Sequence, residues 1–389
     1  MARFLLPLLL VLLLPGCSTI TDIKNDMNER FFGQESGATA AALTDIKSTL
    51  DAKVLWHTSV GNGGEFEFTP AVDAGAVYAA SADGSIERVD AASGKQDWRI
   101  KAEESLSGGV GAGEKLVLVG TRKGMVLAFD QASGKPLWKS RISSEILSAP
   151  KVSGGVVVVR GGDSRIFGLS SADGKRKWVY ERATPALTLR SSAGVTIADG
   201  VAYVGFAGGK LVALAVGDGK VLWDVSVALP KGATEIERIA DITSLPQVDG
   251  RYVYAVAYQG RVACVDRSNG RMLWNRDISS YTGLGIDATH LFITHSGGSI
   301  YAVDYSSGKS YWRQGALLNR QVTAPLPIGR YVVVGDLEGY VHFLDREDGS
   351  FVARVKTESS AVMAQLVQLN SATFLAQTRG GGLYAISLK

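Results

Sequence analysis

The chain has 389 residues and a formal net charge of +3, and its 46 glycines make up about 12 per cent of it against a usual ~7 per cent. With 46% apolar residues and only ten prolines, this composition favours short strands and tight turns over disorder. The small, evenly spread charge argues against a nucleic-acid surface, and two cysteines and four histidines without an HExxH spacing argue against a disulfide framework and a Cys- or His-based metal enzyme.

Residues 1–16 have the pattern of a signal peptide. A leading Arg3 is followed by an apolar run from Phe4 to Leu14, which is too short to cross about 30 Å of hydrocarbon as a helix. The run ends in Leu-Pro-Gly-Cys17, which resembles a bacterial lipobox. We therefore expect the mature chain to begin at an acylated, palmitate-bearing Cys17, although a plain secretory signal that happens to end in Cys is the alternative.

The residues after Cys17 predict where the protein resides. Ser18 stands where an Asp would resemble an inner-membrane retention signal, which favours the outer membrane with the protein facing the periplasm. Residues 17–53 are polar and small, and we predict a lipidated N-terminus and flexible tether that ends where residues 54–389 begin to fold.

A repeat of about 40 residues organises the rest of the chain, and the seven tryptophans mark it. They are Trp56, Trp98, Trp138, Trp178, Trp223, Trp274 and Trp312. From Trp98 onward each follows a phrase of the form Gly-x-Val/Ile-x-Ala-Val/Leu-Asp-x-x-Ser/Asp-Gly-Lys-x-x-Trp. A seventh copy carries Ala353 in place of the Trp, and an eighth stops at the chain end.

Alternating apolar runs predict four strands in each repeat. Residues 54–389 number 336, and 336/8 is 42, which predicts eight units. The orphan Trp strand at 54–60 completes the unfinished last unit at 382–389. The sequence therefore predicts an all-β fold, an eight-bladed β-propeller of four-stranded blades closed by an N-terminal strand in the last blade.

Two repeated residue types invite a functional interpretation. One aspartate stands at the same turn position in most units: Asp90, Asp130, Asp266, Asp304 and Asp345. We interpret these as turn caps and not as metal ligands, because an Asp side chain at a turn start accepts backbone N–H groups. We expect the tryptophans to fill the space between blades and not to line a ligand site.

The repeat resembles that of pyrroloquinoline-quinone (PQQ) type propellers. Combined with the lipobox, the tether and no second domain, the chain resembles the propeller lipoproteins of the outer-membrane β-barrel assembly (BAM) machinery. Segments such as 188–190, 232–241, 334–340 and 348–353 carry this second resemblance. It implies a non-enzymatic scaffold that binds the periplasmic domains of the central subunit BamA and assists barrel insertion, with unfolded barrel precursors as further partners.

The alternatives are a quinoprotein dehydrogenase or another periplasmic ligand-binding propeller. The quinoprotein enzymes need a calcium held by carboxylates and commonly a disulfide between adjacent cysteines. Here Cys17 lies in the lipobox and Cys264 stands alone in an alternating strand, so that disulfide cannot form. We expect no catalytic site, no cofactor and no metal.

Two insertions predict the partner surface. The intervals Trp178–Trp223 and Trp223–Trp274 exceed the repeat, and both surpluses follow a Trp, in the connections from one blade to the next. Strand alternation places these loops side by side on one face, while the tether enters from the opposite face. The resemblance implies that Leu187, Leu189 and Arg190 bind BamA together with Asp241, whereas Thr243 departs from an acidic family position. The alternative is that both leucines begin an inner strand.

Overall fold

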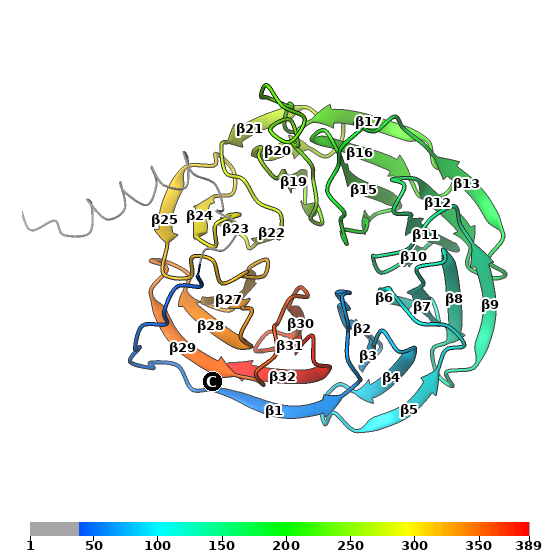
Figure 1. Cartoon of the computed structure of the whole chain (residues 1–389), viewed down its shortest axis with the longest axis horizontal. Helices are drawn as coiled ribbons and strands as arrows, with labels where there is room; N and C mark the ends of the chain where they lie inside the picture. The colour runs from blue at the N-terminus through cyan, green and yellow to red at the C-terminus, as the bar shows by residue number, and fades with distance from the viewer. Residues whose placement is uncertain (1–38, 389) are drawn as a thin grey trace, which may run out of the picture. The chain divides into compact units, whose positions relative to one another are not determined.

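The computed structural model describes residues 39–388, so the predicted signal peptide and Cys17 lie outside the described residues. The described residues form 32 strands in eight four-stranded antiparallel sheets, arranged as blades around a ring (Figure 1). This confirms the predicted eight-bladed propeller. The described residues contain no helix that is long and apolar enough to cross a membrane.

Blades one to seven take their strands in chain order, from the inner strand to the outer strand. Blade one contains β2 (Ala71–Asp73), β3 (Ala76–Ala80), β4 (Ser85–Asp90) and β5 (Gln96–Lys101), and blade two contains β6 (Gly108–Gly113), β7 (Leu116–Gly120), β8 (Met125–Asp130) and β9 (Pro136–Arg141). Blade three contains β10 (Lys151–Ser153), β11 (Val156–Arg160), β12 (Ile166–Ser170) and β13 (Arg176–Tyr180), and blade four contains β14 (Thr196–Ala198), β15 (Val201–Phe206), β16 (Lys210–Ala215) and β17 (Val221–Ser226).

Blade five contains β18 (Gln247–Asp249), β19 (Tyr252–Val256), β20 (Val262–Asp266) and β21 (Met272–Arg276), and blade six contains β22 (Gly283–Ile286), β23 (His290–Thr294), β24 (Ile300–Asp304) and β25 (Ser310–Gln314). Blade seven contains β26 (Leu326–Ile328), β27 (Tyr331–Gly335), β28 (Tyr340–Asp345) and β29 (Phe351–Lys356). Blade eight contains β30 (Val367–Asn370), β31 (Thr373–Gln377) and β32 (Gly382–Leu388), and its outer strand is β1 (Ala52–Ser59).

The two ends of the described chain close the ring. Strand β1 pairs antiparallel with β32 from Ala52 opposite Leu388 to Ser59 opposite Gly382. Leu383, Ala385 and Ile386 on β32 are fully buried. The N-terminal strand therefore completes the last blade, as the two sequence fragments predict.

The tryptophans join each blade to the next. The indole of Trp56 donates a hydrogen bond to the carbonyl of Ala91 at 3.1 Å, and its ring packs on Gly94, where an added Cβ would lie 2.5 Å from the ring. Gly94 also has a φ of +68°, so the turn needs glycine for both reasons. The other tryptophans repeat these contacts with Gln131, Ser171, Val216, Arg267, Tyr305 and Arg346 in the following blades.

The repeated aspartates cap turns. The carboxylate of Asp90 accepts the backbone N–H of Ser93 at 2.9 Å and its hydroxyl at 2.6 Å, and these bonds lower the pKa of Asp90. Equivalent bonds to turn backbone form at Asp130, Asp266, Asp304 and Asp345. The turn-cap interpretation is confirmed.

The closure of the ring explains why blade seven has Ala353 where the other blades have a Trp. Elsewhere the indole docks on the glycine turn between the third and fourth strands of the next blade. In blade eight that turn does not exist, because β32 and β1 are the two ends of the fold. Ala353 is buried there in an apolar cluster that also contains Leu50 from the segment before β1.

Residues 17–38 of the predicted tether lie outside the described residues, and the described part before β1 differs from the flexible segment expected there. The compact unit begins at Ala40, and we call residues 40–51 the strap. The N–H of Ala41 donates to the carbonyl of Leu318 at 3.0 Å, and the N–H of Thr49 donates to Val352 of β29 at 2.9 Å. The dark-blue strap passes outside β29 before it continues into β1 (Figure 1). These contacts are made with residues that lie far away in the sequence, so the local sequence of the strap does not predict them.

Candidate functional site

The two enlarged loops, residues 181–195 and 227–246, follow the outer strands β13 and β17 and lie side by side. The carboxylate of Asp241 accepts the backbone N–H of Leu189 at 2.7 Å, and the hydroxyl of Ser191 donates to the carbonyl of Thr243 at 3.1 Å. Both loops are on the face of the ring that carries the turns between second and third strands, which we call the loop face. No strand forms in 181–195, so Leu187 and Leu189 do not begin an inner strand.

Asp241 is buried beneath the two loops, where it joins their backbones, and its carboxylate is not exposed to solvent. It is 3% exposed, and its second carboxylate oxygen accepts the N–H of Gly208 at 3.0 Å. The expectation of a surface contact is thus corrected: both oxygens face backbone donors of neighbouring segments. Nearby, burial lowers the pKa of Arg160 to about 10, although the charge of Asp241 opposes this shift. Thr243 is also turned inward, since its hydroxyl donates to Tyr281.

Arg190 is half-exposed and held in place by two acidic side chains. Its Nε and Nη2 donate to the two carboxylate oxygens of Glu145 at 3.1 and 2.9 Å, a bidentate pair that raises the pKa of Arg190. Glu65, from the connection between β1 and β2, approaches Nη1 at 3.8 Å, and the guanidinium lies 6.0 Å from the ring centre of Phe66. The cation is therefore preorganised across three separate connections of the loop face.

Apolar side chains flank this cation. Leu187 is 41% exposed, whereas Leu189 is half-buried. Sequence reasoning missed Leu229 and Ile236 in the second loop, which are 65% and 67% exposed. The other exposed large apolar side chains of the described chain lie on the outer strands β1, β9, β13, β17 and β25.

A capped turn holds Ile236 outward. The carboxylate of Glu237 accepts the N–H groups of Ala233 and Thr234 at 2.7 and 3.0 Å, and the hydroxyl of Thr234 accepts the N–H of Glu237 at 3.2 Å. This reciprocal pattern is a capping box, and the spacing Thr234-x-x-Glu237 is its signal in the sequence. The isoleucine is thus exposed on an ordered turn.

Polar cavities lie at the base of these loops. A cavity of about 190 Å³ is lined by Arg160, Leu189, Arg190, Asp241 and Thr243, among others. A second cavity, of about 140 Å³, shares Arg190 and is also lined by Glu65 and Glu67. The predicted residues Leu189, Arg190 and Asp241 therefore border one hollow, while Leu187 lies on the exposed part of the same loop.

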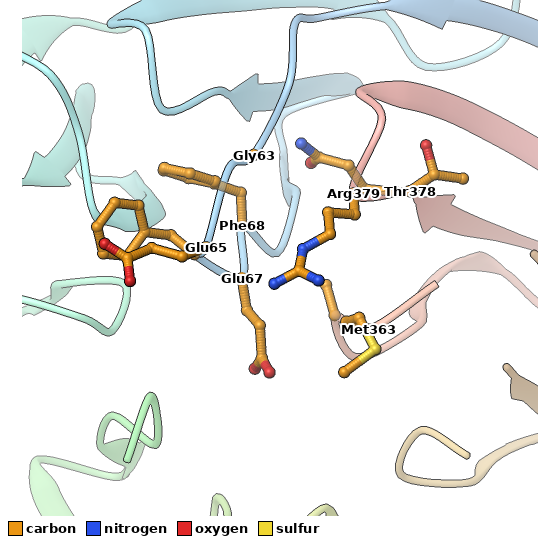
Figure 2. A pocket seen from close by; sticks show the side chains of 10 residues that line it. Gly63, Glu65, Glu67, Phe68, Met363, Thr378 and Arg379 are labelled. Atoms are coloured by element: carbon orange, nitrogen blue, oxygen red, sulfur yellow. The ribbon is translucent and has the colours of Figure 1, made fainter. Parts of the chain in front are cut away.

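A third cavity lies between blades eight and one (Figure 2). Figure 2 shows Glu67 and Arg379 extending from neighbouring segments toward the same space. Desolvation raises the pKa of Glu67, although a hydrogen bond from Ser192 opposes this shift. The cavity measures only about 40 Å³, close to the volume of a water molecule and not of an organic ligand.

The residues present do not fit a quinone held on a divalent cation. Among residues 39–388, no three His, Cys, Asp or Glu side chains gather as a metal-binding group. Cys264 is buried in β20, and burial raises the pKa of its thiol to about 12, which is the behaviour of a small core side chain.

Comparisons with known proteins identify the family. A family profile described as "Outer membrane protein assembly factor BamB" matches residues 46–105, 82–314 and 296–389. A relative of that name from Pseudomonas aeruginosa is 47% identical over 352 residues, which cover 90% of this chain and 92% of the relative. The crystal structure of BamB from Moraxella catarrhalis covers 87% of this chain and 100% of its own, with a TM-score of 0.80 and 27% identity.

A likeness to the dehydrogenases is limited to the fold. The quinohemoprotein alcohol dehydrogenase of Comamonas testosteroni covers 87% of this chain and 76% of its own, with a TM-score of 0.70 but 14% identity. The relatives at high identity are named as assembly factors and not as enzymes. This chain therefore belongs to the family of the outer membrane protein assembly factor BamB.

Proposed function

We propose that this chain is a scaffold lipoprotein, anchored in the outer membrane by acylated Cys17 and facing the periplasm, that binds the periplasmic domains of BamA and assists the insertion of β-barrel proteins. Family membership supports the role in outer membrane protein assembly. One observation carries the choice of surface: Asp241 joins the two enlarged loops, and together they present a preorganised cation beside exposed apolar side chains.

The contacts suggest how the surface works. Leu187 supplies an apolar anchor, and Arg190 supplies a directional, charge-assisted contact. Because Glu145 already fixes the guanidinium, little side-chain freedom is lost when a partner binds. Leu229 and Ile236 extend the apolar area on the second loop. Asp241 acts as a positioning residue, since its oxygens hold the loop backbone and do not reach the partner.

The binding surface is tested by measuring the affinity of purified BamA periplasmic domains for the full-length protein. The double variant Leu187→Ala, Arg190→Ala is expected to bind at least about 30-fold more weakly, a loss of roughly 2 kcal/mol. Asp241→Asn is expected to weaken binding as well, because an amide cannot accept both backbone N–H groups.

A matched control separates contact from general damage. Leu137 is exposed on the outer strand β9 and Arg330 is exposed on the opposite face, so Leu137→Ala, Arg330→Ala removes the same residue types elsewhere. This control is expected to bind like the wild type. Unchanged affinity in a correctly folded Leu187→Ala, Arg190→Ala protein rejects the proposed surface.

Localisation has its own test. Mass spectrometry of the mature protein is expected to find the chain starting at Cys17 with attached acyl chains. Membrane fractionation is expected to recover the protein with the outer membrane, because buried acyl CH₂ groups each contribute about 0.8 kcal/mol to membrane binding. Cys17→Ser is expected to abolish this recovery. An unmodified Cys17 in a membrane-free protein contradicts the anchor.

Unfolded barrel precursors are a second class of partner, favoured by the outer edge of the ring. Leu55, Leu137 and Leu222 are half-exposed on outer strands whose outer edges carry no further strand. A cavity of about 500 Å³ between β5 and β9 is lined by Ile100, Leu137 and Trp138. The same assay with an unfolded barrel segment distinguishes this mode, since the Leu187→Ala, Arg190→Ala variant should retain it.

A further inference from the structure

The strap, residues 40–51, leads the chain across the propeller wall from the loop face to the opposite face. It begins beside Leu318, in the connection between blades six and seven on the loop face. Its end lies on β29, where the N–H groups of Thr49 and Leu50 share the carbonyl of Val352. Only then does β1 begin, on the opposite face, which is where we expected the tether to reach the fold.

Near each end of the strap, an apolar side chain packs against the propeller. Leu43 packs against a cluster that contains Leu317 and Val332 of blades six and seven. Leu50 is buried in the cluster that contains Val352 and Ala353. The strap therefore covers the outer edge of β29 and contributes side chains to the spaces between blades.

Two arginines bind backbone carbonyls in the first part of the strap. Arg320, which is 2% exposed, donates from Nη1 to the carbonyl of Ala41 at 2.8 Å. Arg354 donates from Nη1 to the carbonyl of Thr44 at 3.0 Å. Hydrogen bonds from guanidinium groups to strap carbonyls are charge-assisted and therefore stronger than neutral ones.

Buried groups of blade seven aim both arginines. Nε of Arg320 donates to the fully buried carboxylate of Asp336 at 2.8 Å, and Nη2 donates to Glu338 at 2.6 Å. Nε of Arg354 donates to Nδ1 of His342 at 3.1 Å, while Nε2 of the same ring contacts Asp336 at 2.9 Å. We call Arg320, Asp336, His342 and Arg354 the charged cluster.

We infer that the strap and the charged cluster fix the point at which the N-terminal segment leaves the propeller, placing it on the loop face beside Arg320 and not at the start of β1. The inference rests on the acylation of Cys17 proposed above. Ala40 lies 23 positions after Cys17, a reach of at most about 80 Å, so the lipid anchor is tethered to the face that carries Leu187 and Arg190. Attachment on this face favours orientations of the propeller in which the partner surface lies toward the bilayer.

The test uses the full-length acylated protein on phospholipid vesicles that contain an acceptor dye. A donor dye is attached at Lys231→Cys on the loop face or at Lys220→Cys on the opposite face; both sites are exposed and adjoin blade four. We expect energy transfer at least twofold stronger from the loop-face site. Leu43→Asp removes the apolar contact of the strap with blades six and seven and keeps all four residues of the charged cluster, and it is expected to abolish this difference. Lys47→Asp, an exposed charge change within the strap, is expected to preserve it.

Hydrogen exchange in solution tests the strap without lipid. The amides of Ala41, Thr49 and Leu50 are expected to exchange at least tenfold faster in Leu43→Asp than in the wild type, while the amides of β29 stay protected. Equal energy transfer from the two faces of the wild type, or unprotected strap amides in it, overturns the inference. If the wild-type protein does not bind vesicles while its strap amides remain protected, the proposed acylation of Cys17 is wrong. The inference that the lipid anchor is tethered to the loop face is then rejected as well.

Discussion

Removal of residues 382–389 is expected to abolish the folded propeller. Strand β32 lies between β31 and β1, so its loss leaves β1 without a sheet partner and exposes the edge of β31. Leu383, Ile386 and the largely buried Tyr384 would also leave the core. At about 1.5 to 3 kcal/mol for each buried side chain, the loss reaches the size of a whole domain's stability, about 5 to 15 kcal/mol. Circular dichroism and thermal unfolding measure the result.

Point variants test closure by β32 where the deletion yields no soluble protein. Ile386→Ala in β32 is expected to destabilise the fold by about 2 to 5 kcal/mol, because it leaves a cavity in a fully buried cluster. Leu55→Ala on the paired strand β1 serves as the control, since Leu55 is half-exposed and should change stability by less than about 0.5 kcal/mol. Equal effects of the two substitutions in denaturant titrations would contradict closure by β32.

Asp336→Ala is expected to destabilise the protein by about 3 to 5 kcal/mol, because it leaves buried Arg320 without its buried counter-charge. The effect is read from the denaturant midpoint. Asp97→Ala breaks a partly exposed ion pair with Arg88 and should cost at most about 1 kcal/mol. A result for Asp336→Ala as small as that for Asp97→Ala would show that the charged cluster contributes little to stability.

The same cluster makes stability depend on pH in a defined direction. Burial lowers the pKa of His342 despite the opposing bond to Asp336, so the folded state binds this proton less readily than the unfolded state. Stability is then complete above the unfolded histidine pKa of about 6.5 and declines as the pH falls below it. For Asp336, burial raises the pKa, but bonds from His342 and Arg320 lower it overall. Its contribution is therefore lost at still lower pH, as the carboxylate protonates. Denaturant midpoints measured from pH 7.5 downward should fall first as His342 becomes protonated and again, at lower pH, as Asp336 becomes protonated.

Local sequence patterns predict much of the fold. The recurrence of Trp, the Asp-x-x-Ser/Asp-Gly turn and the four alternating runs predict the blade count, and the two incomplete repeats predict the closure by β1 and β32. These features could be predicted because turn chemistry depends on neighbouring residues and a repeat imposes the same contact in every blade. The insertions likewise predicted which two loops lie together.

Other features were decided by tertiary structure alone. An aspartate in a polar loop is most often exposed, yet Asp241 is buried because backbone N–H groups of two separate segments converge on it. Arg320 reaches Ala41 across 279 positions of sequence, and this contact turns a polar segment expected to be a tether into the strap. The exposure of Ile236 depends on which surfaces the completed ring leaves uncovered. Burial and long-range pairing are properties of the assembled ring, and residue type and spacing do not encode them locally.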